Sequence, residues 1–555
     1  MLVSMLCAAG AGSGCSAPLQ TRVADLVVTN AKIWTVDQTR PRAEAVAVKG
    51  DRIVAVGSVA EVGAWKGPET TVIDAGGRFV MPGFDDSHLH FVQGGMQLDN
   101  VDLKDAPTPD EFARRIGERA KATAPGEWIL GGDWDEQAWT NPGLPTRELI
   151  DPMTPNTPVF VSRYDGHMAL ANSAALKLAG VTAQTKNPAG GEVVRDAKGN
   201  PTGILKDAAM SYVDKVIPAP TPERRLRAIK RALAHAASLG VTSVQDMNPS
   251  ADEIAAYESL AQKGELTCRI YVAPLETAWI ERLKKGTEKR INLTFLRTGA
   301  VKGYADGSLG STTAYFFQPY TDAPKSRGLL SEEMQPLGGM RARLIEADRA
   351  GEQLCIHAIG DQAISMTLAL FADVVGANGA RDRRLRIEHS QHVAPKDFDR
   401  YKQLGVIASV QPYHAIDDGR WAEKRIGPER IKTTYAFRTF LDKGVTLAFG
   451  TDWPVAPLSP YLALYAAVTR ATLDGKNPGG WVPEQTISVA EAIRAYTRDA
   501  AYAEFQEHAK GTIRPGKLAD LVTLTGDPFS VKPEALKDLK AQTTIVGGKV
   551  VYRLQ

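Results

Sequence analysis

Side chains that bind divalent metals stand at the ends of apolar runs that are widely separated in this sequence. His88 and His90 lie in Phe-Asp-Asp-Ser-His-Leu-His, His357 in Leu-Cys-Ile-His, His389 in Leu-Arg-Ile-Glu-His, and Asp452 in Leu-Ala-Phe-Gly-Thr-Asp. Imidazole nitrogens and carboxylate oxygens are ligands of zinc and similar ions. Strand ends that converge on one rim would bring these ligands together. The sequence therefore predicts a metal-assisted hydrolase with one or two divalent ions, and zinc is the expected metal.

Two of the ligands belong to one His-x-His motif. In an extended strand, residues i and i+2 point to the same side, so His88 and His90 would project together while Leu89 packs behind them. The motif follows the apolar run Phe-Val-Met-Pro-Gly-Phe, which favours the end of a strand. An incidental pair of surface histidines is the alternative.

The other three ligands each have a structural alternative. A lone histidine after an apolar run, such as His357 or His389, is often a hydrogen-bonded core residue, and Asp452 could cap a helix that follows a strand. Their order after the His-x-His motif, each on a separate run, favours metal ligation. Neutral imidazoles that bind a metal would need hydrogen-bond acceptors for their other ring nitrogen. Asp361 and Glu388 are the candidate acceptors.

Asp452 has a second predicted role, as the base that orients and deprotonates the attacking water. We take Asp452, His389 and His167 as the candidate catalytic residues.

Lys302 is a further candidate ligand. Because an ammonium group is repelled by a dication, Lys302 can join the site only if it is neutral or if CO2 converts it to a carbamate that bridges two metals. An ion pair with Asp306 is the alternative.

Substrate contacts are expected from polar and aromatic side chains near the predicted strand ends and in the segment after Asp133. Partly apolar pockets with a few polar groups are typical of small-molecule sites. Each of these side chains has an alternative role in packing or in loop structure. The candidates are Asp306, His392, Trp134, Trp453 and Tyr413.

Apolar strand-like runs alternate with helical stretches through most of the chain. An example is the helical stretch 224–239, which is followed by Gly-Val-Thr-Ser-Val-Gln-Asp. Continuous apolar strands separated by helices indicate a parallel sheet that is buried on both faces, and their number favours a (β/α)8 TIM barrel over residues 81–505. Residues 133–218 break this rhythm with Pro-rich and Gly-rich turns. We predict that they form an insertion over the barrel mouth.

Both chain ends are rich in short β-like runs. Residues 21–80 contain alternating strands, with a hairpin predicted at 49–52, and residues 506–555 return to the same pattern. Such small strand sets need neighbours that cover their apolar face. We therefore predict that both ends form one small β-sandwich side domain, so that the fold class is α/β.

The composition is that of an ordinary globular protein. The 555 residues are 43% hydrophobic and 23% charged, and 66 Lys and Arg face 64 Asp and Glu. This balance favours a small-molecule substrate and does not favour nucleic acid as a partner. The sequence leaves a homo-oligomer open.

Residues 1–20 are apolar and small, as in an export signal. Around Cys15 the sequence is also similar to a bacterial lipoprotein cleavage site. We expect an exported bacterial protein that is periplasmic or attached to the membrane by a lipid anchor. If this segment is not a signal, the protein is expected in the cytoplasm.

Eight ordered motifs carry a family resemblance. The chain resembles the amidohydrolase superfamily, and within it the branch called amidohydrolase family 3 or YtcJ-like, which includes N-substituted formamide deformylases. The motifs are Met81-Pro-Gly-Phe-Asp-Asp-Ser-His-Leu-His, Ser162-Arg-Tyr-Asp-Gly-His, Pro201-Thr-Gly-Ile-Leu, Lys302-Gly-Tyr-Ala-Asp-Gly-Ser-Leu-Gly-Ser, His357-Ala-Ile-Gly-Asp-Gln-Ala, Ile387-Glu-His-Ser-Gln-His, Gly450-Thr-Asp-Trp-Pro-Val and Gly516-Lys-Leu-Ala-Asp-Leu-Val.

The resemblance implies cleavage of a C–N bond in an amide, N-acyl or N-formyl compound by a metal-activated hydroxide. It assigns one metal to His88, His90 and Asp452 and a second to His357 and His389. A carboxylated Lys302 would bridge the two, although a single-metal site without the lysine stays open. Lys206 and Asp207 stand where relatives often carry a glutamate, so no acidic role is assigned there.

Other functions fit the same ligands. The site would also suit a cyclic-imide hydrolase, a deaminase or an esterase. A catalytically silent exported binding protein built on the same fold is the alternative outside the enzymes.

Overall fold

The computed structural model describes residues 23–555 except 104, 135, 137, 138, 140–142, 164–167, 189, 190, 311 and 335. The predicted export segment 1–20 and the candidate His167 therefore lie outside the described residues. No helix of the described part is long and apolar enough to span a bilayer.

Two parallel sheets form the centre of the molecule. Their strands are almost wholly buried, including polar residues such as Asp86 and Glu388, as expected for parallel strands covered on both faces. The first sheet has the order β17 (Leu296–Thr298), β16 (Arg269–Ala273), β15 (Val241–Met247), β8 (Phe84–Leu89), and the second has the order β18 (Ala300–Tyr304), β19 (Gln353–Ala358), β20 (Arg386–His389), β21 (Ile407–Val410), β22 (Leu447–Phe449).

Backbone hydrogen bonds join the two sheets at two places, one at the β8 edge of the first sheet and one at the end of β16, next to its β17 edge. At the first place, the Asp452 N–H just after β22 donates to the His88 carbonyl oxygen of β8 at 2.7 Å. At the second place, the Lys302 N–H of β18 donates to the Pro274 carbonyl oxygen just after β16 at 2.8 Å. Only Gly299, at φ +154°, separates β17 from β18. The carboxyl ends of all these strands therefore face the same rim.

Helices follow the central strands in the chain, and the predicted mixed α/β character is confirmed. Three of them begin with favourable caps. The Thr221 side chain accepts the Arg224 N–H at the start of α7, and Ser250 forms a capping box with Glu253 at the start of α8. The Ser459 side chain accepts the Leu462 N–H at the start of α16. The longer helices around the sheets are α2 (Phe91–Asp99), α7 (Pro222–Ser238), α8 (Ala251–Gln262), α9 (Glu276–Lys284), α10 (Leu337–Arg349), α11 (Asp361–Asn378) and α16 (Pro460–Thr469).

Strands from the two ends of the chain share one sheet. Its order is β25 (Lys549–Arg553), β24 (Ala541–Val546), β23 (Leu521–Leu524), β7 (Phe79–Pro82), β2 (Lys32–Trp34), β3 (Arg42–Ala43). A second sheet contains β5 (Arg52–Gly57), β4 (Ala45–Lys49), β1 (Leu26–Thr29) and β6 (Thr71–Asp74) in that order. The predicted hairpin is present, since Lys49 pairs with Arg52.

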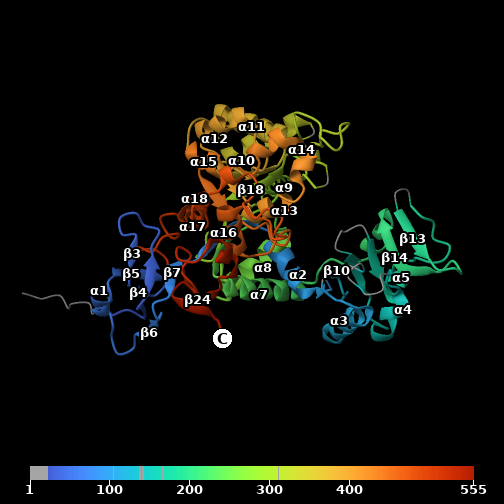
Figure 1. Cartoon of the computed structure of the whole chain (residues 1–555), viewed down its shortest axis with the longest axis horizontal. Coiled ribbons are helices and arrows are strands. Elements are labelled where there is room, and N and C mark those ends of the chain that lie inside the picture. Colours follow the sequence, from blue (N-terminus) through green and yellow to red (C-terminus); the bar gives the residue numbers. More distant parts are fainter. Residues whose placement is uncertain are drawn as a thin grey trace, which may run out of the picture.

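A separate sheet occupies the region of the predicted insertion and begins earlier than predicted, at Val101. It lies to one side of the central strands (Figure 1) and has its own apolar core, which includes Phe112 of α3 (Pro109–Ala122), Trp134 and Trp139. The strand order is β13 (Gly191–Arg195), β14 (Pro201–Asp207), β12 (Met168–Ala171), β11 (Phe160–Arg163), β10 (Gly131–Trp134), β9 (Val101–Asp102).

The described residues of this sheet do not contribute to a roof over the central cavity. Among the described residues, none of those that line the central cavity comes from it. Because its apolar side chains pack against one another and against its own helices, it needs no contact with the strand ends. The rim is lined instead by the 308–310 loop and by α13 (Pro412–Asp418) with the turn that follows it.

Candidate metal centre

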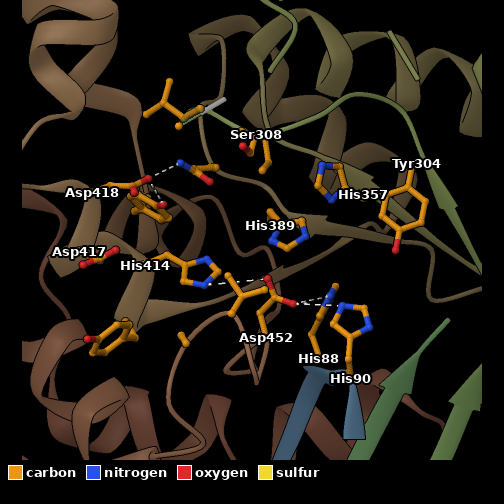
Figure 2. A pocket seen from close by; sticks show the side chains of 18 of the residues that line it. His88, His90, Tyr304, Ser308, His357, His389, His414, Asp417, Asp418 and Asp452 are labelled. Atoms are coloured by element: carbon orange, nitrogen blue, oxygen red, sulfur yellow. Dashed lines mark hydrogen bonds and ion pairs between the residues drawn. The ribbon is translucent and has the colours of Figure 1, made fainter. Parts of the chain in front are cut away.

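The predicted ligands converge on one cavity of about 470 Å³ at the carboxyl ends of the central strands. Figure 2 shows the imidazoles and the Asp452 carboxylate turned toward one another. All six side chains line this cavity: His88, His90, Lys302, His357, His389 and Asp452.

Two pairs of candidate ligand atoms have the spacing found in a metal shell. Asp452 Oδ1 lies 3.5 Å from His88 Nε2 and 3.3 Å from His90 Nε2. Two ligand atoms that are each about 2.0–2.1 Å from a tetrahedral zinc ion are about 3.3 Å apart. One ligand atom each of His88, His389 and Asp452 also lies within 4.8 Å of the others. The donors therefore fit a zinc-like divalent ion.

The remaining imidazole nitrogens are fixed by hydrogen bonds. The Nδ1 atom of His88 lies 2.6 Å from Glu388 Oε2, that of His90 lies 2.7 Å from the Met247 carbonyl oxygen, and that of His389 lies 2.8 Å from Gln411 Oε1. Each acceptor calls for a proton on Nδ1, which leaves the Nε2 lone pair for the metal.

His357 is held in the opposite sense. Its Nε2 atom donates to the Gly307 carbonyl oxygen at 3.0 Å, so Nδ1 is the nitrogen left for a metal. The His357 ring lies 4.4 Å from that of His389. Burial lowers the pKa of His357 to about 3 and that of His88 to about 4, and the nearby Lys302 charge acts in the same direction. Both imidazoles are thus neutral at neutral pH, as metal ligation requires.

Glu388 is one of the two residues predicted to accept a hydrogen bond from a ligating imidazole, and it does accept one from His88. It is fully buried and also receives a hydrogen bond of 2.8 Å from Arg386. Although burial opposes ionisation, the Arg386 charge and the His88 hydrogen bond hold the pKa of Glu388 below its ordinary value. The other candidate, Asp361, accepts the Phe317 N–H instead and does not hold a ligand.

Lys302 is completely buried, with its Nζ atom 3.5 Å from His88 Nε2 and 4.9 Å from the ring centre of Tyr304. Burial lowers its pKa. The alternative of an ion pair with Asp306 is wrong, because the Asp306 carboxylate accepts the N–H groups of Tyr315, Ile359 and Gly360. Asp306 thus orders the loop beside His357 and lies behind the cavity wall.

Two of the predicted ligands also have unusual backbone conformations. His389 has a φ of +71° and Asp452 a φ of +60°. Side chains other than glycine rarely adopt this left-handed region, and such residues concentrate at functional sites. At both strand ends the conformation turns the chain as it leaves the rim.

The predicted aromatic contacts divide into two groups. Tyr413 lines the cavity, together with Tyr304. Trp134 does not, because its buried indole donates to the Val161 carbonyl oxygen inside the separate sheet. Trp453 is also a packing residue, buried between Phe91 and Gly94 of α2.

His392 is a core residue behind the site. Its Nδ1 atom lies 2.8 Å from Thr434 Oγ1, and its Nε2 atom lies 3.1 Å from Gln391 Nε2. Its ring packs against Phe316 at 5.3 Å. The side chain is thus buried by partners that leave it little access to a substrate.

Several cavity residues were not predicted. The most notable is His414, whose Nε2 atom lies 3.9 Å from Asp452 Oδ2. Its position soon after the apolar run that ends at Gln411 is the only signal in the sequence. The other polar or aromatic lining residues beyond the predictions are Ser308, Gln391, Asp417, Asp418, Trp421 and Tyr435.

The sequence pattern of the amidohydrolase family matches residues 71–552. The chain belongs to the amidohydrolase family. It is 32% identical over 530 residues to YtcJ of Bacillus subtilis (strain 168), covering 94% of this chain and 98% of that protein. The predicted resemblance to YtcJ-like amidohydrolases is therefore confirmed.

Two further comparisons agree with this family. This amidohydrolase is 29% identical over 548 residues to an N-substituted formamide deformylase of Arthrobacter pascens, covering 96% of this chain and 99% of that enzyme. Its fold matches the crystal structure of a metal-dependent hydrolase from Pyrococcus horikoshii OT3 with a TM-score of 0.75 and 29% identity, over 92% of this chain and 99% of the other.

Proposed function

We propose that this amidohydrolase cleaves the C–N bond of a small amide, N-acyl or N-formyl compound. The observation that carries the proposal is the position of Asp452, whose Oδ1 atom faces the Nε2 atoms of His88 and His90 while its Oδ2 atom faces the cavity side at His414. A carboxylate placed in this way can contact both a ligand shell and a bound substrate.

In this proposal, a divalent ion held by the His and Asp ligands would polarise the scissile carbonyl group and lower the pKa of a water molecule from about 15.7 toward 7. Asp452 orients that water and accepts its proton. It then delivers the proton to the departing nitrogen. The neutral imidazoles stay in place because Glu388, the Met247 carbonyl group and Gln411 hold their Nδ1 protons.

The substrate class is supported by the similarity to an N-substituted formamide deformylase over nearly the whole chain and by the cavity itself. A volume of about 470 Å³ suits a small molecule. The aromatic side chains of Tyr413, Trp421 and Tyr435 line it, which favours an acyl or aryl group on the substrate.

A second ion is part of the proposal. His357 Nδ1 and His389 Nε2 would hold it, and a carbamate on Lys302 would bridge the two ions. Lys302 suits this reaction because burial lowers its pKa, and only a neutral amine adds to CO2.

The architecture that we propose for this chemistry is a closed (β/α)8 barrel. The hydrogen bonds at two places between the two parallel sheets support closure. We also propose that the sheets built from both chain ends form one side domain, since β7 and β23 pair within a single sheet.

A substrate panel tests the function. Protein treated with a chelator and reloaded with Zn²⁺ is assayed with N-formyl amines, N-acyl amino acids, hydantoins and simple esters. We expect turnover of amide-type members, loss of activity in His88→Ala, and retained activity in the control His508→Ala, whose side chain is exposed. Exclusive turnover of hydantoins or esters would reject the proposed bond type, and full activity of His88→Ala would reject the site.

A further inference from the structure

His414 carries a buried nitrogen without a partner. Its Nε2 atom has essentially no solvent contact and no hydrogen bond among the described residues, yet the residue lines the central cavity. Native proteins seldom leave a buried polar atom unsatisfied unless a ligand or a function uses it. This nitrogen therefore has an unused hydrogen-bonding capacity beside the cavity.

The position of this nitrogen relative to Asp452 suggests which substrate atom it contacts. His414 Nε2 and Asp452 Oδ2 are 3.9 Å apart, which is too long for a direct hydrogen bond. A substrate nitrogen about 2.8–3.0 Å from each of them would be within hydrogen-bonding distance of both. In Figure 2 both groups face the same part of the cavity.

His414 lies in the first turn of α13, beside His389. Its backbone N–H donates to the Gln411 carbonyl oxygen at 3.1 Å in the first turn of α13. The ring lies parallel to that of His389, with an angle of 11° and 6.4 Å between the centres. Because Gln411 also holds His389, one short segment positions a ligand and His414 together.

We propose that His414 is a catalytic residue that accepts a hydrogen bond from the N–H of the scissile amide, so that the preferred substrates are secondary amides. This inference rests on the proposed function. When the C–N bond breaks, its electron pair goes to the nitrogen, which takes the proton that Asp452 removed from water. His414 holds the original N–H and thereby turns the nitrogen lone pair toward Asp452 Oδ2, with no net gain or loss of a proton.

A matched pair of substrates and two variants test this role. N-benzylformamide carries the N–H and N-benzyl-N-methylformamide lacks it. We expect the wild-type preference for the secondary amide in kcat/KM to fall by about tenfold in His414→Phe, the value of one hydrogen bond. His414→Gln, which restores a hydrogen-bond acceptor, should recover much of the preference for the secondary amide. The control variant His508→Phe should keep all of this preference.

The phenylalanine variant separates this role from a steric one. Phenylalanine keeps the shape of the ring, so a preference caused only by a clash with the N-methyl group would survive in His414→Phe. An unchanged ratio of kcat/KM values in that variant, with metal content equal to that of the wild type, would overturn the inference while leaving the proposed function intact. If His414→Phe does not fold, His414→Asn replaces it, because the asparagine amide is too short to reach the substrate N–H. The same ratio of kcat/KM values for the two formamides is then the test. Absence of turnover for every amide would instead reject the proposed function, and this role with it.

Discussion

His88 donates its Nδ1 proton to Glu388 Oε2 at 2.6 Å, and both side chains have no solvent exposure. Glu388 is itself held by Arg386 at 2.8 Å, and the Arg386 guanidinium also donates to the Ser87 carbonyl oxygen at 2.6 Å. A buried charge pair thus holds the imidazole of the proposed metal ligand His88 on the side away from the cavity. Such acceptors orient the imidazole and raise its basicity.

We expect Glu388→Gln to weaken metal binding by about 10–100-fold, as is typical when the acceptor of a ligating histidine is lost. Competition with a chelator measures the affinity. The variant should also lose about 3–5 kcal/mol of unfolding free energy, because Arg386 is left buried without its counter-charge. Wild-type affinity in this variant would show that Glu388 does not support His88.

A double variant is the matched control for stability. Arg386→Met combined with Glu388→Gln removes both charges, so it should be more stable than Glu388→Gln alone while its metal affinity stays low. Equal stability of the two variants would contradict the role of the charge pair.

We expect Asp452→Asn to lower kcat/KM by about 10²–10⁴-fold, the usual contribution of a positioned general base. The amide oxygen can still face His88 and His90 but cannot take a proton from water. Steady-state kinetics with the best amide of the panel measures the loss, and metal analysis of the same sample separates it from loss of the ion. An activity within tenfold of the wild type would exclude Asp452 as the base.

Asp418 provides a pH-dependent prediction away from the ligands. Burial raises its pKa from an ordinary value of 3.8 to about 6, although it accepts hydrogen bonds from Tyr435 and Gln391 at 2.6 and 2.7 Å. The charged or titratable groups around it are Tyr435, His414 and Asp417. Because the folded pKa is the higher one, the stabilisation that Asp418 contributes is fully present below pH 3.8 and is lost as the pH rises through 6.

Asp418→Asn cannot ionise, so its unfolding free energy relative to the wild type should increase between about pH 4 and 6 and then stay constant. The total increase should be at most about 3 kcal/mol. Urea unfolding of both metal-free proteins across this range measures it, since effects at the ligands cancel in the difference. A constant or decreasing difference would show that Asp418 is ionised as easily in the folded state as in the unfolded one.

Periodic features of the fold could be predicted from the sequence. Several of the parallel strands, such as β22, lie in apolar runs of the sequence, and the hairpin at Lys49 and Arg52 follows from local turn residues. The location of the separate sheet could not be predicted, because Trp134 packs within that sheet through contacts that depend on tertiary structure. A tryptophan near a predicted strand end looks the same in sequence whether it faces a cavity or a core.

The site shows the same division. His88, His90 and Asp452 could be predicted because strand ends determine where they converge. His392 and Asp306 also follow apolar strands, yet neither lines the cavity, because His392 is hydrogen-bonded to Thr434 and Asp306 accepts backbone N–H groups. His414 was missed because its role depends on a distance to Asp452 across the cavity, which no spacing in the sequence encodes.

Lys302 provides the last prediction. We expect metal-loaded protein supplied with ¹³C-bicarbonate to show a carbamate carbon signal and about two ions per chain. Lys302→Met, which keeps the length of the side chain without its nitrogen, should lose the signal and retain about one ion. Lys510 is an internal control, since it is equally buried but ion-paired with Asp85 at 2.9 Å, and its pKa is raised despite burial by the charges of Asp85 and Glu504. A charged amine does not add to CO2, so any signal that remains in Lys302→Met, or two ions in that variant, would contradict a bridging carbamate at Lys302.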